Sequence, residues 1–344
     1  MSIKILHIHP SLQMAKIFIS PLMKAESKNG YITKLIVCEN NHFIKMYTGI
    51  KKYNPDILIS HNTTSSILPL LFARFLKIKK IVYFNHGVPF IGYRFPLKLI
   101  LYKLEVINCC LADYVYTVSI DMYKILKKIK HNDLMLSNPG SVSGISFSKK
   151  KFINFRKIFN VNKETTVICF IGRPVARKGF HLILDVWEEF FLNNKNYVLF
   201  LCGPDQKDLR NHGLLNSNNI ITLGFSGHVE SVLKSSNFMV LPSYHEGLSY
   251  AVLESLSVKC PVITSNIPGI KSLIKHKFNG MLIDIENKSK AATRLYNTII
   301  YLENNKSLVS KIKKNGLITA KKYTRKKVVA SYIGNLNKIG EQLK

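Results

Sequence analysis

The sequence has little of what a membrane-spanning or disulfide-bonded protein needs. Its nearest approach to a membrane span, residues 67–75, is far shorter than the roughly 18 residues required, and Arg74 interrupts it. The first residues lead directly into a strand pattern, without the segments of a signal peptide. Six cysteines occur without any C-x-x-C spacing. These absences predict a reduced, cytoplasmic protein with neither disulfides nor a structural zinc ion.

Acidic residues are also scarce, since 20 Asp and Glu stand against 50 Lys and Arg and the formal net charge is +30. The excess is +14 over residues 1–150 and +16 over the remainder, so it is not confined to a tail. Such a charge suits an anionic acceptor or an anionic membrane surface, unless it only reflects a Lys-, Ile- and Asn-rich composition. No nucleic-acid-binding motif accompanies the charge, so a nucleic-acid partner is not expected.

The sequence does contain a regular alternation of short apolar strands with helical patterns. With 344 residues there is room for about two domains. The alternation predicts an α/β fold with parallel, doubly wound sheets. A lysine run at residues 149–151 marks the expected boundary, between a domain of residues 1–155 and a domain of residues 156–324. The expected strands lie at residues 3–9, 32–38, 56–60, 80–84, 115–119, 134–137, 165–171, 197–202, 220–223, 239–242, 261–265 and 279–283.

One strand–loop–helix segment carries two carboxylates. The apolar strand at residues 239–242 is followed by Glu246 and Gly247 in a loop, and then by a helical pattern from Tyr250 that includes Glu254. A helix N-terminus offers unpaired N–H donors and partial positive charge, which suit a phosphate. The two carboxylates suit sugar hydroxyls instead, because a carboxylate only accepts hydrogen bonds. Alternatively, Glu246 merely favours the helix N-terminus and Glu254 is a solvated helix residue.

A second strand end carries cations. The strand at residues 165–171 is followed by Gly172, Arg173, Lys178 and Gly179, and then by a helical pattern at 181–191. Arg offers a planar bidentate fork and Lys a point charge, so this loop suits a diphosphate. An unliganded surface pair of cations is the alternative.

A third strand end carries a histidine. His86 and Gly87 follow the strand at residues 80–84. They therefore lie at the carboxyl edge of the expected sheet, where open parallel sheets bind ligands. A turn histidine that bonds to nearby backbone is the alternative.

These motifs resemble the donor site of the retaining, nucleotide-sugar-dependent glycosyltransferases of family 4. The frame E-G-hydrophobic-x-x-x-hydrophobic-hydrophobic-E is filled from Glu246 to Glu254, and G-R-x-x-x-x-K-G is filled from Gly172 to Gly179. The resemblance implies a GT-B fold, in which two Rossmann-like domains have parallel sheets that face each other across a cleft. It implies that the first domain serves the acceptor, that the second binds the nucleotide sugar, and that a last helix at about 325–344 packs back on the first.

The resemblance also assigns roles to single residues. His86 and Glu246 are the expected catalytic residues, and Glu254 is expected to hold the ribose. Phe225 is expected to border the base. The donor diphosphate is expected at two cations and at a helix that starts near Leu248, namely at Arg173, Lys178, Gly247, Leu248 and Ser249.

The implied reaction moves a hexose or an N-acetylhexosamine from a nucleotide sugar, expected to be UDP-linked, with retention of configuration. The expected acceptor is a glycan or a polyprenyl-diphosphate-linked glycan in the synthesis of bacterial O-antigen, capsule or lipopolysaccharide. The loop at residues 138–145 is similar to that of a subset of family members, several of which transfer N-acetylated hexoses, although Pro139 departs from that subset. An interdomain connector is the alternative for this loop. No Asp-x-Asp motif occurs, so the reaction is expected to need neither a metal nor another cofactor.

Other features widen the range of hypotheses. Residues 93–111 interleave Arg94, Lys98 and Lys103 with apolar side chains, which suits either peripheral contact with the anionic inner face of the cell membrane or an ordinary crossover helix. Two departures from the family are Ser11, where a glycine-rich loop is usual, and Ser249, where many members have Pro. A GT-B epimerase or phosphorylase is an alternative function. A basic nucleic-acid or membrane-binding module is another, although it does not explain the paired motifs.

Overall fold

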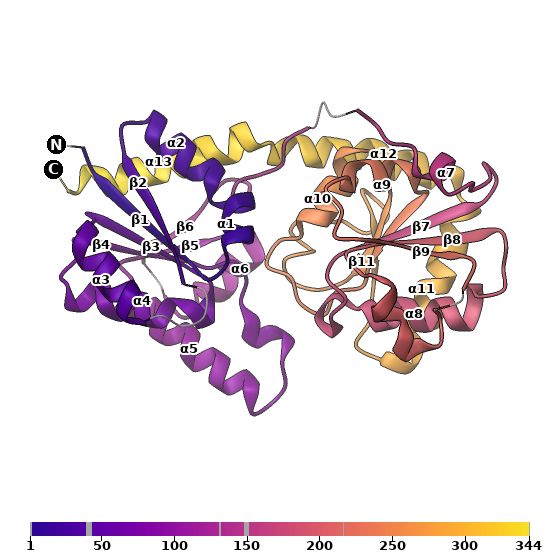
Figure 1. Cartoon of the computed structure of the whole chain (residues 1–344), viewed down its shortest axis with the longest axis horizontal. Helices are drawn as coiled ribbons and strands as arrows, with labels where there is room; N and C mark the ends of the chain where they lie inside the picture. The colour runs from indigo at the N-terminus through magenta and orange to yellow at the C-terminus, as the bar shows by residue number, and fades with distance from the viewer. Residues whose placement is uncertain (1, 39–42, 131, 148–150, 216, 344) are drawn as a thin grey trace. The chain divides into compact units, whose positions relative to one another are not determined.

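The computed structural model describes residues 2–38, 43–130, 132–147, 151–215 and 217–343. The chain forms two compact units (Figure 1): unit 1 comprises Met1–Gly144 and Tyr323–Lys344, and unit 2 comprises Ile145–Lys322. Each unit contains a six-stranded sheet whose strand pairs are parallel. The predicted α/β fold with two Rossmann-like units is confirmed.

The sheet of unit 1 has the order β2-β1-β3-β4-β5-β6. Its central strands are apolar on both faces, as expected where helices cover both sides of a parallel sheet. In β3 every residue is buried, and Ile57, Leu58 and Ile59 have no exposed surface. The strands are β1 (Lys4–His9), β2 (Ile32–Val37), β3 (Ile57–His61), β4 (Lys80–Phe84), β5 (Tyr114–Thr117) and β6 (Leu134–Leu136).

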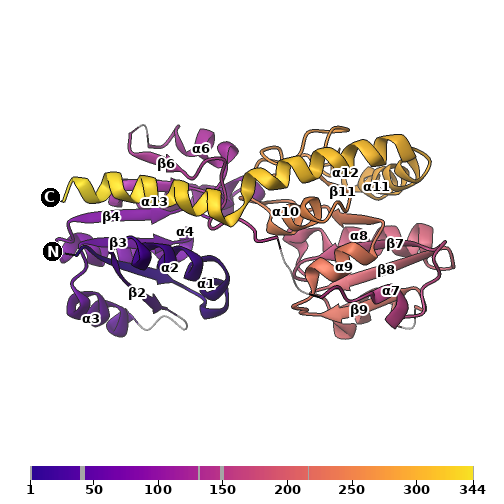
Figure 2. The ribbon, with the colours of Figure 1, turned by 90° about the horizontal axis from the view of Figure 1, so that it is seen from above.

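The helices of unit 1 include one from the far end of the chain. That helix is α13 (Arg325–Glu341), which packs against α2 and is seen in yellow along unit 1 in Figure 2. Its buried stripe of Val328, Tyr332, Leu336 and Ile339 follows helical spacing. The other helices are α1 (Leu12–Phe18), α2 (Ser20–Lys28), α3 (Phe43–Tyr53), α4 (Thr63–Phe75), η2 (Pro89–Gly92), α5 (Leu97–Leu111) and α6 (Ile120–Leu126).

The sheet of unit 2 has the order β12-β11-β10-β7-β8-β9. Its inner strands are again continuous apolar runs, and Phe170, Leu199 and Phe200 are fully buried. Burying one such side chain contributes about 1.5–3 kcal/mol, so these strands fix the core on which the loops rest. The strands are β7 (Thr166–Ile171), β8 (Tyr197–Cys202), β9 (Ile220–Gly224), β10 (Phe238–Leu241), β11 (Val262–Ser265) and β12 (Met281–Ile283).

The helices of unit 2 follow the strands in alternation. The helix expected at residues 181–191 begins as α8 (Phe180–Val186) and continues as the π-helical segment η4 (Trp187–Phe191). The others are α7 (Phe155–Ile158), η3 (Ala176–Lys178), η5 (Gln206–His212), α9 (Val229–Ser235), α10 (Tyr250–Ser257), α11 (Lys288–Glu303) and α12 (Lys306–Ala320), with the short η6 (Lys321–Tyr323) after them.

Each sheet has one point at which the strand order reverses. In unit 1 it lies between β1 and β3, and in unit 2 between β7 and β10. Open α/β sheets bind ligands outside the carboxyl ends of the strands at such a point. The residues that follow these strands are therefore the first place to look for a site.

Candidate active site

In unit 2 the two sequence motifs meet at the reversal point of the sheet. The cationic loop follows β7, and the loop with Glu246 follows β10, the neighbouring strand. Gly179 joins them: its φ is +71°, and a Cβ there would lie 2.0 Å from the carbonyl oxygen of Pro242. Only glycine allows this approach of the two backbones.

Lys178 and Glu246 form the centre of this arrangement. Lys178 Nζ lies 2.6 Å from Glu246 Oε1, and the Ser243 hydroxyl donates to the same oxygen at 2.9 Å. The side chains are only 17% and 6% exposed, so removing one partner would leave the other charge poorly solvated. Arg177 supports the loop, because its Nη1 donates to the carbonyl of His245.

Arg173 differs from Lys178 in having no partner. Its side chain is exposed, and the described part of the chain offers it no hydrogen bond or ion pair. The structure thus places Arg173 beside the strand end as an available cation.

The start of α10 corrects one expectation. The helix begins at Tyr250, not near Leu248, because Ser249 is its N-cap and accepts a hydrogen bond from the Val252 N–H through its hydroxyl. Gly247 and Leu248 therefore belong to the preceding loop. Both are buried, and within the described residues their backbone N–H groups have no hydrogen-bond acceptor. Unpaired N–H groups just before a helix suit an anion.

Glu254 lies in α10, and Phe225 lies in a different element of unit 2, the loop after β9. The Glu254 side chain is half-buried, and no described residue donates a hydrogen bond to its carboxylate. Burial, together with the charge of Glu230, raises the pKa of Glu254 to about 7. Phe225 is 77% exposed in the loop between β9 and α9.

His86 lies in unit 1, directly after β4, and is half-buried. Its Nε2 lies 2.9 Å from Nδ1 of His61. Burial and the nearby His9 lower the pKa of His86 to about 3. The following turn is held by Asn85, whose Oδ1 accepts from the Gly87 N–H at 2.9 Å.

Glu105 on α5 holds Asn85, and through it the turn, by accepting hydrogen bonds. It is fully buried and accepts hydrogen bonds from Asn85 Nδ2 at 2.7 Å, Tyr83 OH at 2.9 Å and Thr63 Oγ1 at 2.9 Å. Burial outweighs these donors and raises the pKa of Glu105 to about 7. Sequence reasoning missed Glu105, because a Glu in a basic apolar stretch looks solvated.

Sequence reasoning also missed the groups behind His86. His61 ends β3, and His7 lies within β1; both are fully buried. His7 contacts Glu26, which is fully buried on α2. A signal existed, because histidines recur at the ends of apolar strands, at His9, His61 and His86.

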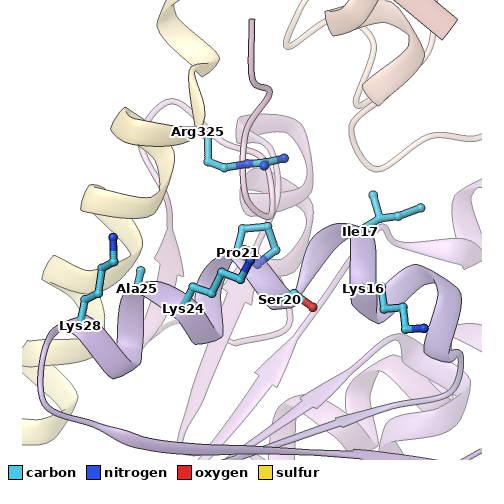
Figure 3. Close-up of a pocket in the computed structure, with 8 residues that line it drawn as sticks. All are labelled: Lys16, Ile17, Ser20, Pro21, Lys24, Ala25, Lys28 and Arg325. Atoms are coloured by element: carbon cyan, nitrogen blue, oxygen red, sulfur yellow. The ribbon is translucent and has the colours of Figure 1, made fainter. Parts of the chain in front are cut away.

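Unit 1 also has a basic pocket on its surface (Figure 3). It has a volume of about 520 Å³ and lies between α1, α2 and the start of α13. Cations and small or apolar side chains line it: Lys16, Ile17, Ser20, Pro21, Lys24, Ala25, Lys28 and Arg325. No acidic side chain lies among these eight residues, so the pocket can attract anions without being selective for one.

Two α/β units with parallel sheets, and two strand–loop–helix motifs that meet at the reversal point of the second sheet, agree with a GT-B glycosyltransferase fold. Profile matches agree: residues 151–318 match the glycosyl transferases group 1, and residues 32–119 match the glycosyl transferase 4-like profile. The chain therefore belongs to the family 4 type of glycosyl transferases group 1, and it is a glycosyltransferase.

Similar proteins include several bacterial glycosyltransferases. One is a UDP-Gal:alpha-D-GlcNAc-diphosphoundecaprenol alpha-1,3-galactosyltransferase of Escherichia coli, 26% identical over 73% of this chain and 68% of that protein. A second is an N,N'-diacetylbacillosaminyl-diphospho-undecaprenol alpha-1,3-N-acetylgalactosaminyltransferase of Campylobacter jejuni, 22% identical over 90% and 83%. A third is the capsular polysaccharide biosynthesis glycosyltransferase CapM of Staphylococcus aureus, 23% identical over 79% and 74%.

Solved structures support the fold. Anabaena HepE, solved in complex with UDP and glucose, superposes with a TM-score of 0.77 at 13% identity, covering 98% of this chain and 100% of that chain. A sucrose-phosphate synthase from Thermosynechococcus elongatus gives 0.79 at 15% identity, covering 99% and 100%. No helix within the described ranges is both long and apolar enough to cross a membrane.

Proposed function

We propose that the protein transfers a hexosyl or N-acetylhexosaminyl group from a UDP-sugar to a polyprenyl-diphosphate-linked glycan, with retention, during bacterial surface-polysaccharide assembly. The observation that carries the proposal is the set of unsatisfied groups in unit 2. Within the described residues, Arg173 is a cation without a partner, and the backbone N–H groups of the buried residues Gly247 and Leu248 have no acceptor. Glu254 is half-buried, and none of the described residues donates to its carboxylate. A nucleoside diphosphate has the complementary groups.

The roles follow from this complementarity. Negative charge develops on the leaving diphosphate when the bond to the sugar breaks. Arg173, Lys178 and the two N–H groups stabilise that charge electrostatically from fixed positions. The ribose hydroxyls donate to Glu254, and the exposed ring of Phe225 covers the base. Glu246 contacts hydroxyls of the donor sugar or its oxocarbenium-like centre, and His86 contacts the reacting sugar.

The donor and acceptor chemistry is supported by the relatives. Two of them are named for undecaprenyl-diphosphate-linked acceptors, and one of those for UDP-galactose as donor. Retention is supported by the resemblance of the Glu246–Glu254 frame to that of retaining enzymes. The anomeric configuration of the product, read by NMR, tests retention directly. Metal independence stays a prediction, and transfer that stops with a chelator and returns with Mg²⁺ or Mn²⁺ would contradict it.

Nucleotide binding is the first test. Thermal unfolding is followed with UDP, GDP, ADP and their sugar conjugates, since a ligand at a hundredfold excess over its Kd stabilises the folded state by about 2.7 kcal/mol. We expect a shift with UDP and a larger one with one UDP-sugar. Arg173→Ala should weaken UDP binding about 10- to 100-fold, as expected for a charge-assisted contact of about 1.5–3 kcal/mol.

Lys195→Ala is the matched control, because Lys195 is an exposed cation of unit 2 outside the two motifs. It should leave UDP binding within about twofold, the scatter expected of an exposed, uninvolved charge. Equal losses in both variants would indicate general charge attraction. The absence of a shift with every nucleotide would count against a donor site in unit 2.

Peripheral membrane contact is a further part of the proposal, supported by an unusual polarity of α5. Its buried side includes the polar residues Glu105 and Asn108. Its outer side instead exposes apolar groups next to Lys98 and Lys103, in what we call the α5 patch: Leu97, Leu99, Ile100, Tyr102 and Ile107, each between 42% and 52% exposed. Exposed apolar groups beside exposed lysines suit the surface of an anionic bilayer.

Liposome flotation tests the α5 patch with two variants of equal charge change. The double variant Lys98→Glu/Lys103→Glu should weaken binding to anionic vesicles at least about 30-fold, at about 1 kcal/mol for each lysine near the surface. Lys24→Glu/Lys28→Glu changes the basic pocket of Figure 3 by the same charge and should have a clearly smaller effect. Equal losses would show that net charge, and not the α5 patch, drives binding.

A further inference from the structure

Unit 1 contains a continuous line of hydrogen-bonding groups that connects His86 to a buried carboxylate. His86 Nε2 lies 2.9 Å from His61 Nδ1, and His61 Nε2 lies 3.0 Å from His7 Nδ1. His7 Nε2 lies 2.9 Å from Glu26 Oε1 and 3.1 Å from Oε2. Tyr332 on α13 donates to Glu26 Oε1 at 2.6 Å. We call Glu26, His7, His61 and His86 the histidine array.

The array is closed at one end and open at the other. Glu26, His7 and His61 have no exposed surface, and both nitrogens of each inner ring are used within the array. His86 is half-buried, and the described part of the chain offers its Nδ1 no partner. The array therefore ends at a single nitrogen, beside the reversal point of the sheet.

The carboxylate sets the direction of every hydrogen bond. An ionised Glu26 only accepts, so His7 donates from Nε2 and its Nδ1 must accept when the ring is neutral. His61 then donates from Nε2 to His7, and His86 donates from Nε2 to His61. In this state the His86 Nδ1 has no proton and can accept a hydrogen bond from a hydroxyl.

One added proton reverses this direction. If His7 is an imidazolium, it donates from both nitrogens, to Glu26 and to His61. His61 and His86 then carry their protons on Nδ1, although both rings are neutral. A proton can thus enter at His86 while the positive charge comes to rest on His7, in contact with Glu26.

The local electrostatics favour that resting place. Burial and neighbouring histidines lower the pKa of His61 well below its usual value, and burial and His9 lower the pKa of His86 to about 3. Burial alone would raise the pKa of Glu26, but the charge of His7 and the hydrogen bonds from His7 and Tyr332 outweigh it and lower that pKa. Positive charge is therefore unfavourable on the two outer rings, whereas the ionised form of Glu26 is stabilised beside His7.

We propose that Glu26, His7 and His61 are positioning residues that make His86 a proton acceptor for the acceptor hydroxyl, by moving the proton through the array to His7. This inference rests on the proposed function. In the step, the acceptor oxygen forms its bond to the anomeric carbon, and the bond from that carbon to the diphosphate breaks with its electron pair on the diphosphate. The acceptor proton passes to His86 Nδ1, His86 gives its Nε2 proton to His61 Nδ1, and His61 gives its Nε2 proton to His7 Nδ1.

The first test is ¹⁵N-histidine NMR of the ligand-free protein during a pH titration. On lowering the pH, His7 should become doubly protonated while His61 and His86 exchange Nε2–H for Nδ1–H, all at one common midpoint. His9 faces His61 and His86 with ring centroids at 5.6 and 6.0 Å, and should titrate separately. Tyr332, Tyr31 and Tyr53 also face Glu26, and the pKa of each is raised above its ordinary value, so they stay neutral in this range.

Two variants should move the midpoint in opposite directions. Glu26→Gln removes the charge that stabilises the His7 imidazolium, so the midpoint should fall by more than one pH unit. Tyr332→Phe removes a donor to Glu26 and makes the carboxylate more basic, so the midpoint should rise. Rings that titrate independently with fixed tautomers, or a midpoint that neither variant moves, would overturn the relay.

Kinetics then separate the relay from the proposed function. In Glu26→Gln, kcat at neutral pH should fall about 10²-fold, the lower end of general acid–base contributions, with the UDP-sugar KM within about twofold. Tyr332→Phe should keep kcat within about threefold, because the array retains both of its proton states. A concerted switch with unchanged kcat in Glu26→Gln would overturn the catalytic role. If the wild-type protein transfers no sugar at all, the proposed function fails, whatever the NMR shows.

Discussion

Both units have polar groups near the reversal points of their sheets, but the two units differ in whether these groups have hydrogen-bond partners within the protein. In unit 1 the groups behind His86 are buried and bonded to one another, as in Glu26–His7–His61 and in the Glu105 network. In unit 2 several groups, such as Arg173 and the carboxylate of Glu254, have no partner among the residues that the structure describes. Buried polar groups are normally satisfied within a protein. The polar groups of unit 2 are therefore those expected of a ligand-binding surface, and the buried polar groups of unit 1 are those expected to hold the His86 ring in place.

Lys178 and Glu246 of unit 2 are paired with each other, and a change at this pair should have the largest effect. Glu246→Ala should reduce kcat/KM at least about 10³-fold, or roughly 4 kcal/mol, because it removes a group at the reacting sugar and leaves Lys178 without its partner. Steady-state kinetics with the UDP-sugar found by thermal shift measures the loss. Folding is checked by near-UV circular dichroism.

A double-mutant cycle with Lys178→Met and Glu246→Gln sharpens the comparison. The pair is mostly buried, so each single variant should lose stability by leaving one charge without its partner. The double variant should be destabilised by less than the sum of the two single losses. Activity should not recover with stability, because both groups also serve the donor. Additive losses of stability would show that the two charges do not stabilise each other, and a double variant that is active would overturn their role at the donor.

Much of unit 2 was accessible from the sequence because its signals are local. A strand, a glycine-containing loop and a helix lie within about 20 residues at β10 and α10, and the structure confirms a strand ending at Leu241 and a helix from Tyr250 to Ser257. The helical pattern predicted from Tyr250 is confirmed, but the helix start expected near Leu248 at the diphosphate is not, because the Ser249 cap depends on a side-chain contact and not on apolar spacing. The contact of Lys178 with Glu246 was also missed, since it joins residues 68 positions apart.

The support behind His86 was not accessible, because it depends on strand order and on a distant helix. His7 meets His61 only because β1 and β3 are neighbours in parallel register, 54 positions apart. Glu26 meets Tyr332 across 306 positions. His86 could be identified from the sequence because it directly follows a strand. The rest of the array could not, since no local sequence pattern indicates which strands pair.

Glu105 in unit 1 offers a medium effect on stability. Its pKa is raised to about 7, above the ordinary value of 4.5, so the folded state holds this proton more tightly than the unfolded state does. The resulting stability is fully present below about pH 4.5 and is lost as the pH rises through 7, by up to roughly 3 kcal/mol at 1.36 kcal/mol per pKa unit. Urea unfolding between pH 5 and 8 measures this slope.

Glu105→Gln is the test of that cause. Gln can still accept from Tyr83 and Asn85, and its amide can donate to Thr63. The variant should therefore fold and show a flatter pH dependence than the wild type. If the free energy of unfolding of the variant depends on pH as steeply as that of the wild type, the effect belongs to other groups. The polar groups of unit 1 would then be less fully satisfied at neutral pH than the hydrogen bonds of Glu105 indicate.

Glu254 in unit 2 offers the smallest effect and the most direct test of the difference between the units. Its pKa is also about 7, but here a ligand is expected to supply the missing donors, and these favour the ionised form. UDP-sugar binding should then release close to half a proton at pH 7, and the affinity should fall up to about tenfold per pH unit below 7.

A UDP-sugar is preferable to UDP, because its diphosphate has no group that titrates near neutral pH. Isothermal titration in two buffers of different ionisation enthalpy measures the released proton, and Glu254→Gln should abolish both the release and the pH dependence. Binding that releases no proton would mean that Glu254 remains protonated and unpaired in the complex. The difference between unit 2, where a ligand satisfies the polar groups, and unit 1, where the protein does, would then not apply to the ribose site.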